Sequence, residues 1–169
     1  MLKFLACAGA AWLASSFAAP VQAMDNGVCP AGLICASNPD GVKAAFAAEG
    51  VAVKVESDER GNPLFIAANT YEYEVHFLGC STPRTCDALQ FVVFIDKQPG
   101  FTPAFVSDWN MRSRFIRLAL TPEGDLVGVM DVATTGGLNA ANFATNIYWW
   151  NMMSKGIGIA LESWSKSGS

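Results

Sequence analysis

The side chains with the most evident chemical potential lie in the segment from Tyr71 to Leu78, whose residues alternate as those of a strand do. A strand here would place Glu72, Glu74 and His76 on one face, because alternate residues point the same way. Two carboxylates and an imidazole could begin a metal site, or the carboxylates could serve as acid and base. No apolar pocket that would shift a pKa can be read nearby. The pattern therefore favours a solvated strand face, without catalytic or metal-binding residues.

Other chemistry has a weaker basis. No G-x-S-x-G segment is present, so the sequence offers no framework for an activated serine. Thr134-Thr135-Gly136-Gly137 could cradle an anion with its backbone N–H groups, but it lacks the lysine of a phosphate-binding loop. A plain loop before a helix is favoured, and no cofactor is expected. A small-ligand module or enzyme built on Glu74, His76 and Gln90, or around Arg114, is the alternative.

The first residues have the pattern of a secretion signal. Lys3 gives a positive start, Phe4 to Ala19 is apolar and uncharged, and Val21-Gln22-Ala23 resembles a cleavage site. We predict a signal peptide over residues 1–23, cut after Ala23, and a periplasmic or secreted mature chain. The apolar run is too short for a durable membrane anchor, and Cys7 lies too early for lipidation.

Cysteine usage agrees with export. Four cysteines follow the leader, Cys29, Cys35, Cys80 and Cys86, and an even number in an exported chain indicates disulfides. Three connectivities are possible, and we favour Cys29–Cys35 with Cys80–Cys86, since each pair brackets a short loop that carries proline. Zinc is the rival ligand for these thiols. It is disfavoured because the C-x₂-C spacing is missing and no histidine adjoins the cysteines.

Charge and length restrict the possible partners. The formal net charge is −4 and no basic run occurs, which argues against nucleic acid and against anionic lipid surfaces. The length after cleavage suits one domain, and the apolar content is ample for one core. No stable membrane insertion of the mature chain is expected.

Hydrophobic period, caps and turn residues predict an irregular arm over residues 24–37 and one α+β domain over residues 38–165. The predicted sheet has about six strands, is largely antiparallel and is flanked by helices, in the order α-β-β-β-β-α-β-β-α. The chain is expected to begin with a helix from Asn38-Pro39-Asp40 to Gly50, followed by strands at Val51–Glu56, Pro63–Ala67, Tyr71–Leu78 and Ala88–Ile95. A second helix from Thr102-Pro103 to Met111 or Arg112 precedes two strands at 114–121 and 126–133. The final helix is capped by Asn139, runs from Ala140 to Lys155 or beyond, and is weakened at Gly156 and Gly158.

The last two strands should form a hairpin around Pro122-Glu123-Gly124-Asp125, with Thr121 opposite Leu126. That register places Arg114 and Asp131 on one face, within reach of each other. A partly covered ion pair is favoured there over a ligand site. In the preceding helix, the Trp109 indole should cover the sheet, and the Asn110 amide should satisfy loose backbone groups.

These residues resemble a known family. Trp109-Asn110, Arg114-Phe115, Gly124-Asp125, Asp131-Val132 and Gly136-Gly137 are similar to the YbjN domain family, and Phe77-x-Gly79-Cys80, Cys86 and Leu89-Gln90-Phe91 match its secreted branch. The resemblance covers Asn38 to Trp164. It implies a fold similar to type III secretion chaperones, a label of bacterial sensory transduction regulator, and no established catalytic residues.

The last helix is apolar on an unusually wide face. Tyr148, Trp149, Met152 and Met153 widen a stripe that would otherwise meet the sheet. They belong either to the core or to a surface for a protein or peptide partner or for a second copy, and the fold implied by the resemblance favours the second use among functional ones. We expect an exported, non-enzymatic binding protein with a chaperone-like role. A regulator that acts indirectly in envelope stress is the alternative.

Overall fold

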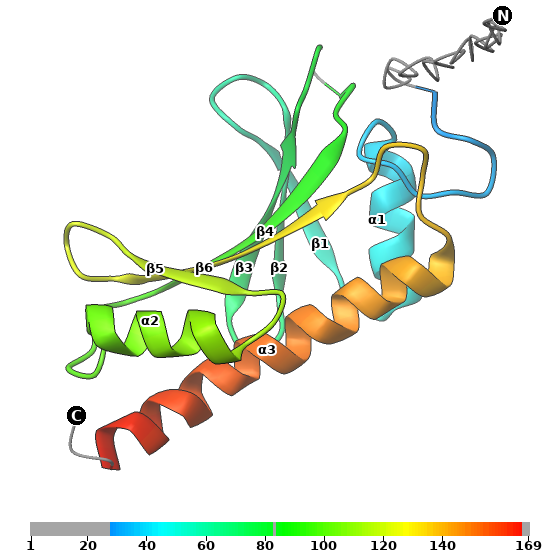
Figure 1. The fold of residues 1–169 in the computed structure, drawn as a ribbon. Coiled ribbons are helices and arrows are strands. Elements are labelled where there is room, and N and C mark those ends of the chain that lie inside the picture. Colours follow the sequence, from blue (N-terminus) through cyan, green and yellow to red (C-terminus); the bar gives the residue numbers. More distant parts are fainter. Residues whose placement is uncertain (1–27, 83, 167–169) are drawn as a thin grey trace, which may run out of the picture.

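The computed structural model describes residues 28–82 and 84–166, which form three helices and one six-stranded sheet (Figure 1). The predicted order of elements is confirmed. The elements are α1 (Pro39–Ala48), β1 (Val53–Ser57), β2 (Pro63–Ala68), β3 (Glu72–Leu78), β4 (Ala88–Ile95), α2 (Pro103–Arg112), β5 (Arg117–Leu120), β6 (Leu126–Ala133) and α3 (Ala140–Lys166).

Each helix begins at a side-chain cap that the sequence predicts. Asn38 Oδ1 accepts a hydrogen bond from the Gly41 N–H at 3.2 Å, and Thr102 Oγ1 accepts one from Phe105 at 3.1 Å. In α3, Asn139 Oδ1 accepts from the Asn142 N–H at 2.8 Å. These bonds satisfy N–H groups that the first turn of a helix leaves without partners.

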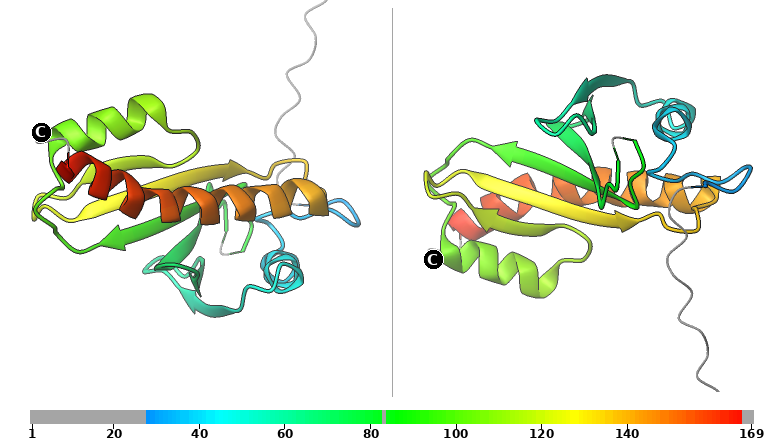
Figure 2. Two further views of the ribbon diagram at one scale, coloured as in Figure 1. Left: turned by 90° about the horizontal axis from the view of Figure 1, so that it is seen from below. Right: turned by 90° about the horizontal axis from the view of Figure 1, so that it is seen from above.

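The strands lie in the order β1-β2-β3-β4-β6-β5, and every neighbouring pair is antiparallel, so the predicted α+β class is confirmed. Helices α1 and α3 pack on one face of the sheet (Figure 2), and aromatic side chains form the centre of the core there. Phe46 of α1 meets Phe143 of α3 with ring centres 5.3 Å apart, and Trp150 of α3 lies 5.3 Å from Tyr73 of β3. Such edge and tilted contacts add to the large apolar area that these rings bury.

Helix α3 continues through both glycines, so the weakening expected there does not break the helix. Ile157, between the glycines, is only 1% exposed, and the ring of Trp164 lies 6.0 Å from that of Phe105 in α2. Packing against the core and α2 outweighs the roughly 1 kcal/mol that each glycine costs a helix. Within the described residues no helix is both long and apolar enough to cross a membrane.

The hairpin register differs from the expected one by one residue. Leu120, not Thr121, lies opposite Leu126, because the turn is closed by bonds between Thr121 and Asp125. A shift of one residue exchanges the faces. Asp131 therefore pairs with Arg117, and the expected Arg114–Asp131 pair is wrong.

The strand also starts later than expected, at Arg117, because a tight turn precedes it. The Ile116 N–H donates to the Arg114 carbonyl at 2.7 Å, which closes a γ-turn centred on Phe115 with φ +66°. A turn with a positive central φ is rare and strained for a bulky residue. Residues 114–116 are therefore not part of the strand.

Helix α2 closes the free edge of β5. The Asn110 amide donates to the Leu118 carbonyl at 2.9 Å, and its oxygen accepts from the Leu118 N–H at 2.8 Å. The Trp109 indole donates to the Ile116 carbonyl at 2.9 Å. Asn110 thus satisfies backbone groups, as predicted, and at Leu118 it takes the place that a neighbouring strand would have.

The N-terminal arm is tied to the domain by covalent and polar links. Cys29 is bonded to Cys35, and Ile34 pairs with Leu138 ahead of α3. The buried Thr134 hydroxyl accepts from the Ala36 N–H and donates to the Asp87 carbonyl, both at 2.9 Å. The second disulfide, Cys80–Cys86, closes the β3–β4 connection, so the favoured pairing is the one found. The predicted signal peptide and residues 24–27 lie outside the described residues.

Candidate binding surface

Four large apolar side chains gather at one place on the surface, and we call them the aromatic cluster: Phe115, Tyr148, Trp149 and Met152. Phe115 stacks on Trp149 with ring centres 4.9 Å apart, and Tyr148 meets Trp149 edge-on at 5.5 Å. Met152 lies one helical turn beyond Tyr148 on α3. Phe115 is 47% exposed, Tyr148 56% and Met152 49%, which is high for side chains of this size grouped together.

The γ-turn is what brings Phe115 into the cluster. In a regular strand its neighbours Arg114 and Ile116 would share one sheet face and Phe115 the other. The positive φ at Phe115 turns the chain, so that Phe115 stacks on α3 and does not lie on the opposite sheet face. Ile116 is buried, at 1% exposed. Left-handed backbone costs a residue with a side chain about 1–2 kcal/mol. Strain of this kind tends to occur at functional sites.

The four α3 residues singled out from the sequence do not behave alike. Tyr148 and Met152 are exposed and Trp149 is half-buried, whereas Met153 packs against the core. The stripe beside them on α3 is buried and consists of Phe143, Ile147, Trp150 and Ser154. Phe115 carries part of the family resemblance, but the sequence does not place it on this surface, because its neighbours have the pattern of a strand and nothing in a single sequence marks a positive φ at phenylalanine.

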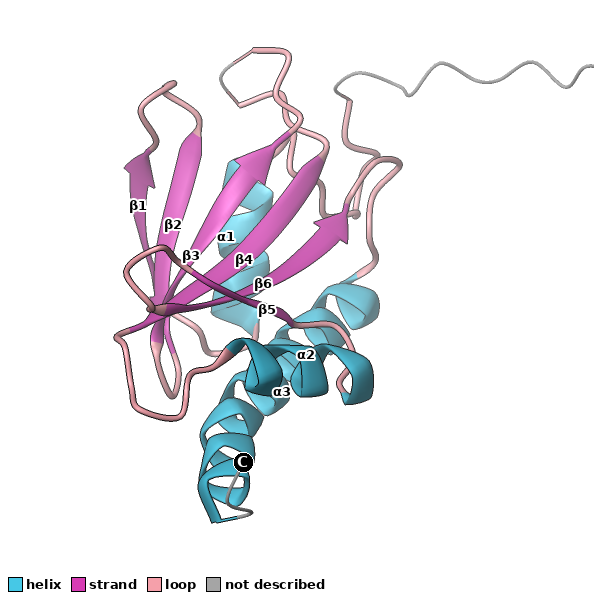
Figure 3. Ribbon diagram, turned by 60° about the vertical axis from the view of Figure 1, so that its left-hand side comes forward, coloured by secondary structure: helices cyan, strands magenta, loops and turns pink. Residues whose placement is uncertain are grey.

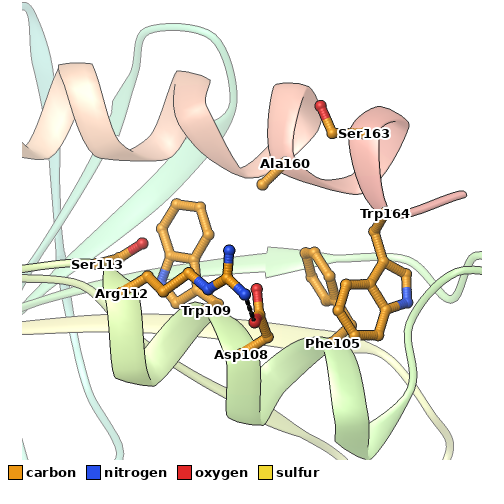
Figure 4. Close-up of a pocket in the computed structure, with 8 residues that line it drawn as sticks. All are labelled: Phe105, Asp108, Trp109, Arg112, Ser113, Ala160, Ser163 and Trp164. Atoms are coloured by element: carbon orange, nitrogen blue, oxygen red, sulfur yellow. Dashed lines mark ion pairs between the residues drawn. The ribbon is translucent and has the colours of Figure 1, made fainter. Parts of the chain in front are cut away.

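A groove of about 440 Å³ lies further along α3, against α2 (Figure 4). Its lining is Phe105, Asp108, Trp109, Arg112, Ser113, Ala160, Ser163 and Trp164. The Arg112–Asp108 ion pair, at 2.8 Å, lies over the α2 side of this groove, and the aromatic rings lie on either side of it. The groove therefore combines apolar walls with one ion pair, in which the arginine is exposed and the aspartate is partly buried.

The aromatic cluster and the groove belong to the same side of α3. Trp149 and Ala160 are eleven residues apart, close to three full turns, so they project in nearly the same direction about 16 Å apart along the axis. On the other wall, Ser113 lines the groove and Phe115 follows two residues later. One extended apolar segment of a partner could therefore contact both.

The polar residues considered first lie on the sheet face opposite α1 and α3. His76, Gln90 and Asp131 are direct cross-strand neighbours on β3, β4 and β6. His76 Nε2 lies 2.6 Å from Glu74 Oε2, and the Gln90 amide donates to Asp131 Oδ1 at 2.7 Å. The row also contains the Arg117–Asp131 pair, so its groups satisfy each other on a solvent-facing surface.

The remaining candidates for chemistry have structural partners. In the loop considered as an anion cradle, the Thr134 N–H donates to the Asp87 carbonyl at 3.0 Å and the Gly137 N–H to the Thr134 carbonyl at 2.9 Å, so these backbone groups are already engaged. Within the described ranges, no three His, Cys, Asp or Glu side chains are grouped so that they could hold a metal ion. Burial raises the pKa of Tyr73 to about 12, and its hydroxyl has no hydrogen-bond partner among those residues. This tyrosine lies in the core beneath α3, not at a surface site.

The described residues thus form a small α+β domain with an open antiparallel sheet and an exposed aromatic cluster on its longest helix. The sequence profile of the YbjN family, described as "Putative bacterial sensory transduction regulator", matches residues 38–161. The chain belongs to the YbjN family. A search of the curated proteins found no significant match.

Two solved structures share the fold. The crystal structure of E. coli YbjN, titled "a putative transcription regulator", is similar to this chain with a TM-score of 0.52 and 14% identity, over 80% of this chain and 96% of that one. An uncharacterized protein from Methanothermobacter thermautotrophicus gives a TM-score of 0.53 at 13% identity, over 75% of this chain and 97% of that one. At these identities the likeness establishes the fold alone.

Proposed function

We propose that this protein is a non-enzymatic binding protein that holds an apolar segment of a protein or peptide partner on the aromatic cluster. The observation that carries the proposal is the exposure of Phe115 and Tyr148, which both contact Trp149, and of Met152 one helical turn beyond Tyr148. Aromatic and methionine side chains provide large contact areas at interfaces, and methionine adapts to different partners.

The groove beside α2 extends the proposed binding surface beyond the aromatic cluster. A bound segment that starts on the aromatic cluster would place further apolar side chains between Trp109 and Ala160. An acidic group on the same segment could pair with the exposed guanidinium of Arg112, in exchange for its contact with Asp108. The preferred partner is therefore an apolar, aromatic-containing segment with charges towards one end. A role in sensory regulation, as the family description states, would then act through this contact.

Peptide binding tests the proposal with a matched pair of variants. The probes are fluorescein-labelled peptides with aromatic residues spaced for the cluster and the groove, and the same peptides with alanine at those positions. Tyr148→Ala should weaken binding of the aromatic peptides by about tenfold or more, as is usual for a central aromatic contact. Phe94→Ala is the control, because Phe94 is 57% exposed but lies on the sheet face away from α3.

Equal binding by the Tyr148→Ala and parent proteins would contradict the proposal. A loss confined to Phe94→Ala would move the surface to the open sheet face. Binding of aromatic and alanine peptides with equal affinity would show that the apolar contacts are not what recognises the partner.

We also propose that the protein acts in the periplasm or outside the cell. Two disulfides that each close a short loop are typical of an oxidising compartment, and the first residues read as a cleavable leader. Mass spectrometry of the protein from fractionated cells should find it outside the cytoplasm, cut after Ala23, with all four remaining thiols oxidised. Recovery from the cytoplasm with free thiols at Cys80 and Cys86 would refute export.

A further inference from the structure

The two edge strands of the sheet differ in whether their outward-facing backbone groups have hydrogen-bond partners. On β5 the N–H and C=O of Leu118 are occupied by Asn110, whereas β1, at the other margin, has no described element beyond it in Figure 3. Four of the five residues in Val53–Ser57 are exposed. Outside its pairing with β2, no described backbone hydrogen bond involves this strand. An open strand edge is a template for pairing with another chain.

The backbone groups that face this open edge can be identified. In an antiparallel pair, directly opposed residues alternate between those that exchange hydrogen bonds and those that do not. Asp58 donates to the Asn62 carbonyl at 2.9 Å, whereas Ser57 lies opposite Pro63, which has no N–H. Lys54 and Glu56 therefore bond to β2. Val53, Val55 and Ser57 point their N–H and C=O groups outward.

The side chains of β1 suit one occupant in particular. Lys54 and Glu56 lie on either side of Val55 on the same sheet face, and both are exposed. If a second copy of β1 pairs antiparallel with Val55 opposite Val55, each Lys54 faces the other copy's Glu56. These would be pairs without mutual backbone bonds, in which side chains approach most closely.

Neighbouring registers that use the same backbone groups fail on charge. A shift in one direction places Lys54 opposite Lys54, and a shift in the other places Glu56 opposite Glu56. Like charges directly opposite each other destabilise a strand pair. Of these three registers, only the one centred on Val55 satisfies the backbone and adds an opposite charge across the interface to the Lys54–Glu56 ion pair that each strand already contains.

We propose that β1 is a docking edge for a second copy of this chain, and that the two copies form a continuous sheet in the register centred on Val55. About six backbone hydrogen bonds would join the strands, two between the Val55 residues and two at each Val53–Ser57 pair. An interface of this size is in the small, transient class. The inference does not rest on the aromatic cluster.

Sedimentation velocity of the oxidised protein, at concentrations up to about 1 mM, measures the association. The parent should show a concentration-dependent dimer. Lys54→Glu and Glu56→Lys should each weaken it by about tenfold or more, because each variant opposes two like-charged pairs across the interface. An equimolar mixture of the two variants should dimerise again, since opposite charges then face each other at both positions.

The mixture is also the control for folding, because two misfolded variants would not restore each other. A monomeric parent at the highest concentration would overturn the proposal, as would single variants that dimerise like the parent. Failure of the mixture would overturn the register. Tyr148→Ala should dimerise normally, and loss of the dimer in that variant would assign self-association to the aromatic cluster instead.

Discussion

The positive φ at Phe115 leads to a prediction in which the usual order of two substitutions is reversed. Phe115→Ala removes the stacking on Trp149, worth about 0.5–1.5 kcal/mol, and about half the burial of a phenylalanine side chain, worth a further 1 kcal/mol or so. Alanine keeps the cost of left-handed backbone. We expect Phe115→Ala to lower the free energy of unfolding by about 2 kcal/mol.

Phe115→Gly loses the same contacts but relieves the strained turn. Left-handed backbone costs a residue with a side chain about 1–2 kcal/mol, and glycine avoids this cost. Part of the stabilisation is offset because glycine loses more conformational entropy on folding than alanine does. The glycine variant should therefore be more stable than the alanine variant by about 1 kcal/mol. Both should lose affinity for aromatic peptides, because the ring is gone from the aromatic cluster in either case.

Phe94 is the control position, where the difference in stability between the alanine and glycine variants should have the opposite sign. It is exposed to a similar degree, but it lies in a regular strand, and Arg84 and Phe115 are the only described residues besides glycine with a positive φ. There alanine should be more stable than glycine by about 0.5–1 kcal/mol. Urea unfolding of the four oxidised variants gives both differences. An alanine variant at position 115 that matches or exceeds the glycine variant would refute the strained γ-turn.

Three further predictions concern stability. Asn110→Ala should cost about 2 kcal/mol in urea unfolding, because both backbone groups that it serves on β5 lose their partner, while Asn110→Asp should recover part of this loss. Replacing Cys80 and Cys86 together by serine should cost about 2 kcal/mol, the loop-closure entropy of so short a loop, and dithiothreitol should have no further effect at that site. The pKa of Tyr73 is raised from 10.0 to about 12 in the folded chain. The protonated side chain therefore stabilises the fold fully below pH 10, and this stabilisation is lost as the pH rises towards about 12. Urea midpoints measured across that range should fall less steeply for Tyr73→Phe, and an identical alkaline decline in both proteins would contradict burial as the cause.

The order and most boundaries of the elements could be predicted because local signals agree with packing there. Strand β4 has the predicted bounds Ala88–Ile95, and α1 starts after the predicted cap Asn38, since alternation, caps and turn residues all indicate the same limits. Export rests on a leader pattern that lies outside the described residues, and the partner has no local signal in the sequence, so both stay predictions.

The hairpin register could not be predicted, and Gly128 shows why. It points into the core, where a β-carbon would lie 3.0 Å from Val93 and 3.3 Å from Ile116 and Leu118. Glycine does not count as an apolar residue in the alternation that marks the buried face of a strand. The sequence pattern therefore favours the face of Val127 and Val129 as the buried one over the face that contains Gly128. Close packing of neighbours, which a pattern of single residues does not record, determines the face.

The two proposed surfaces together give a final prediction, on binding strength. The twofold axis of the β1 pairing is perpendicular to the sheet, so both copies would keep α1 and α3 on the same face of the joined sheet. The dimer would then present two aromatic clusters on one side, and a ligand with two apolar segments on a flexible linker could bind both.

Such a tethered ligand should bind the parent, at concentrations where the dimer forms, more tightly than a single peptide by about tenfold or more. Lys54→Glu should lose this advantage while its affinity for the single peptide stays unchanged, because Lys54 lies on β1, at the sheet edge, and not in the aromatic cluster. Calorimetric titration of both ligands into both proteins measures the four affinities. If the tethered ligand keeps its advantage with Lys54→Glu, the two clusters do not meet through β1. If the single peptide also weakens, Lys54 contributes to the binding surface itself, and the separation between edge and cluster is wrong.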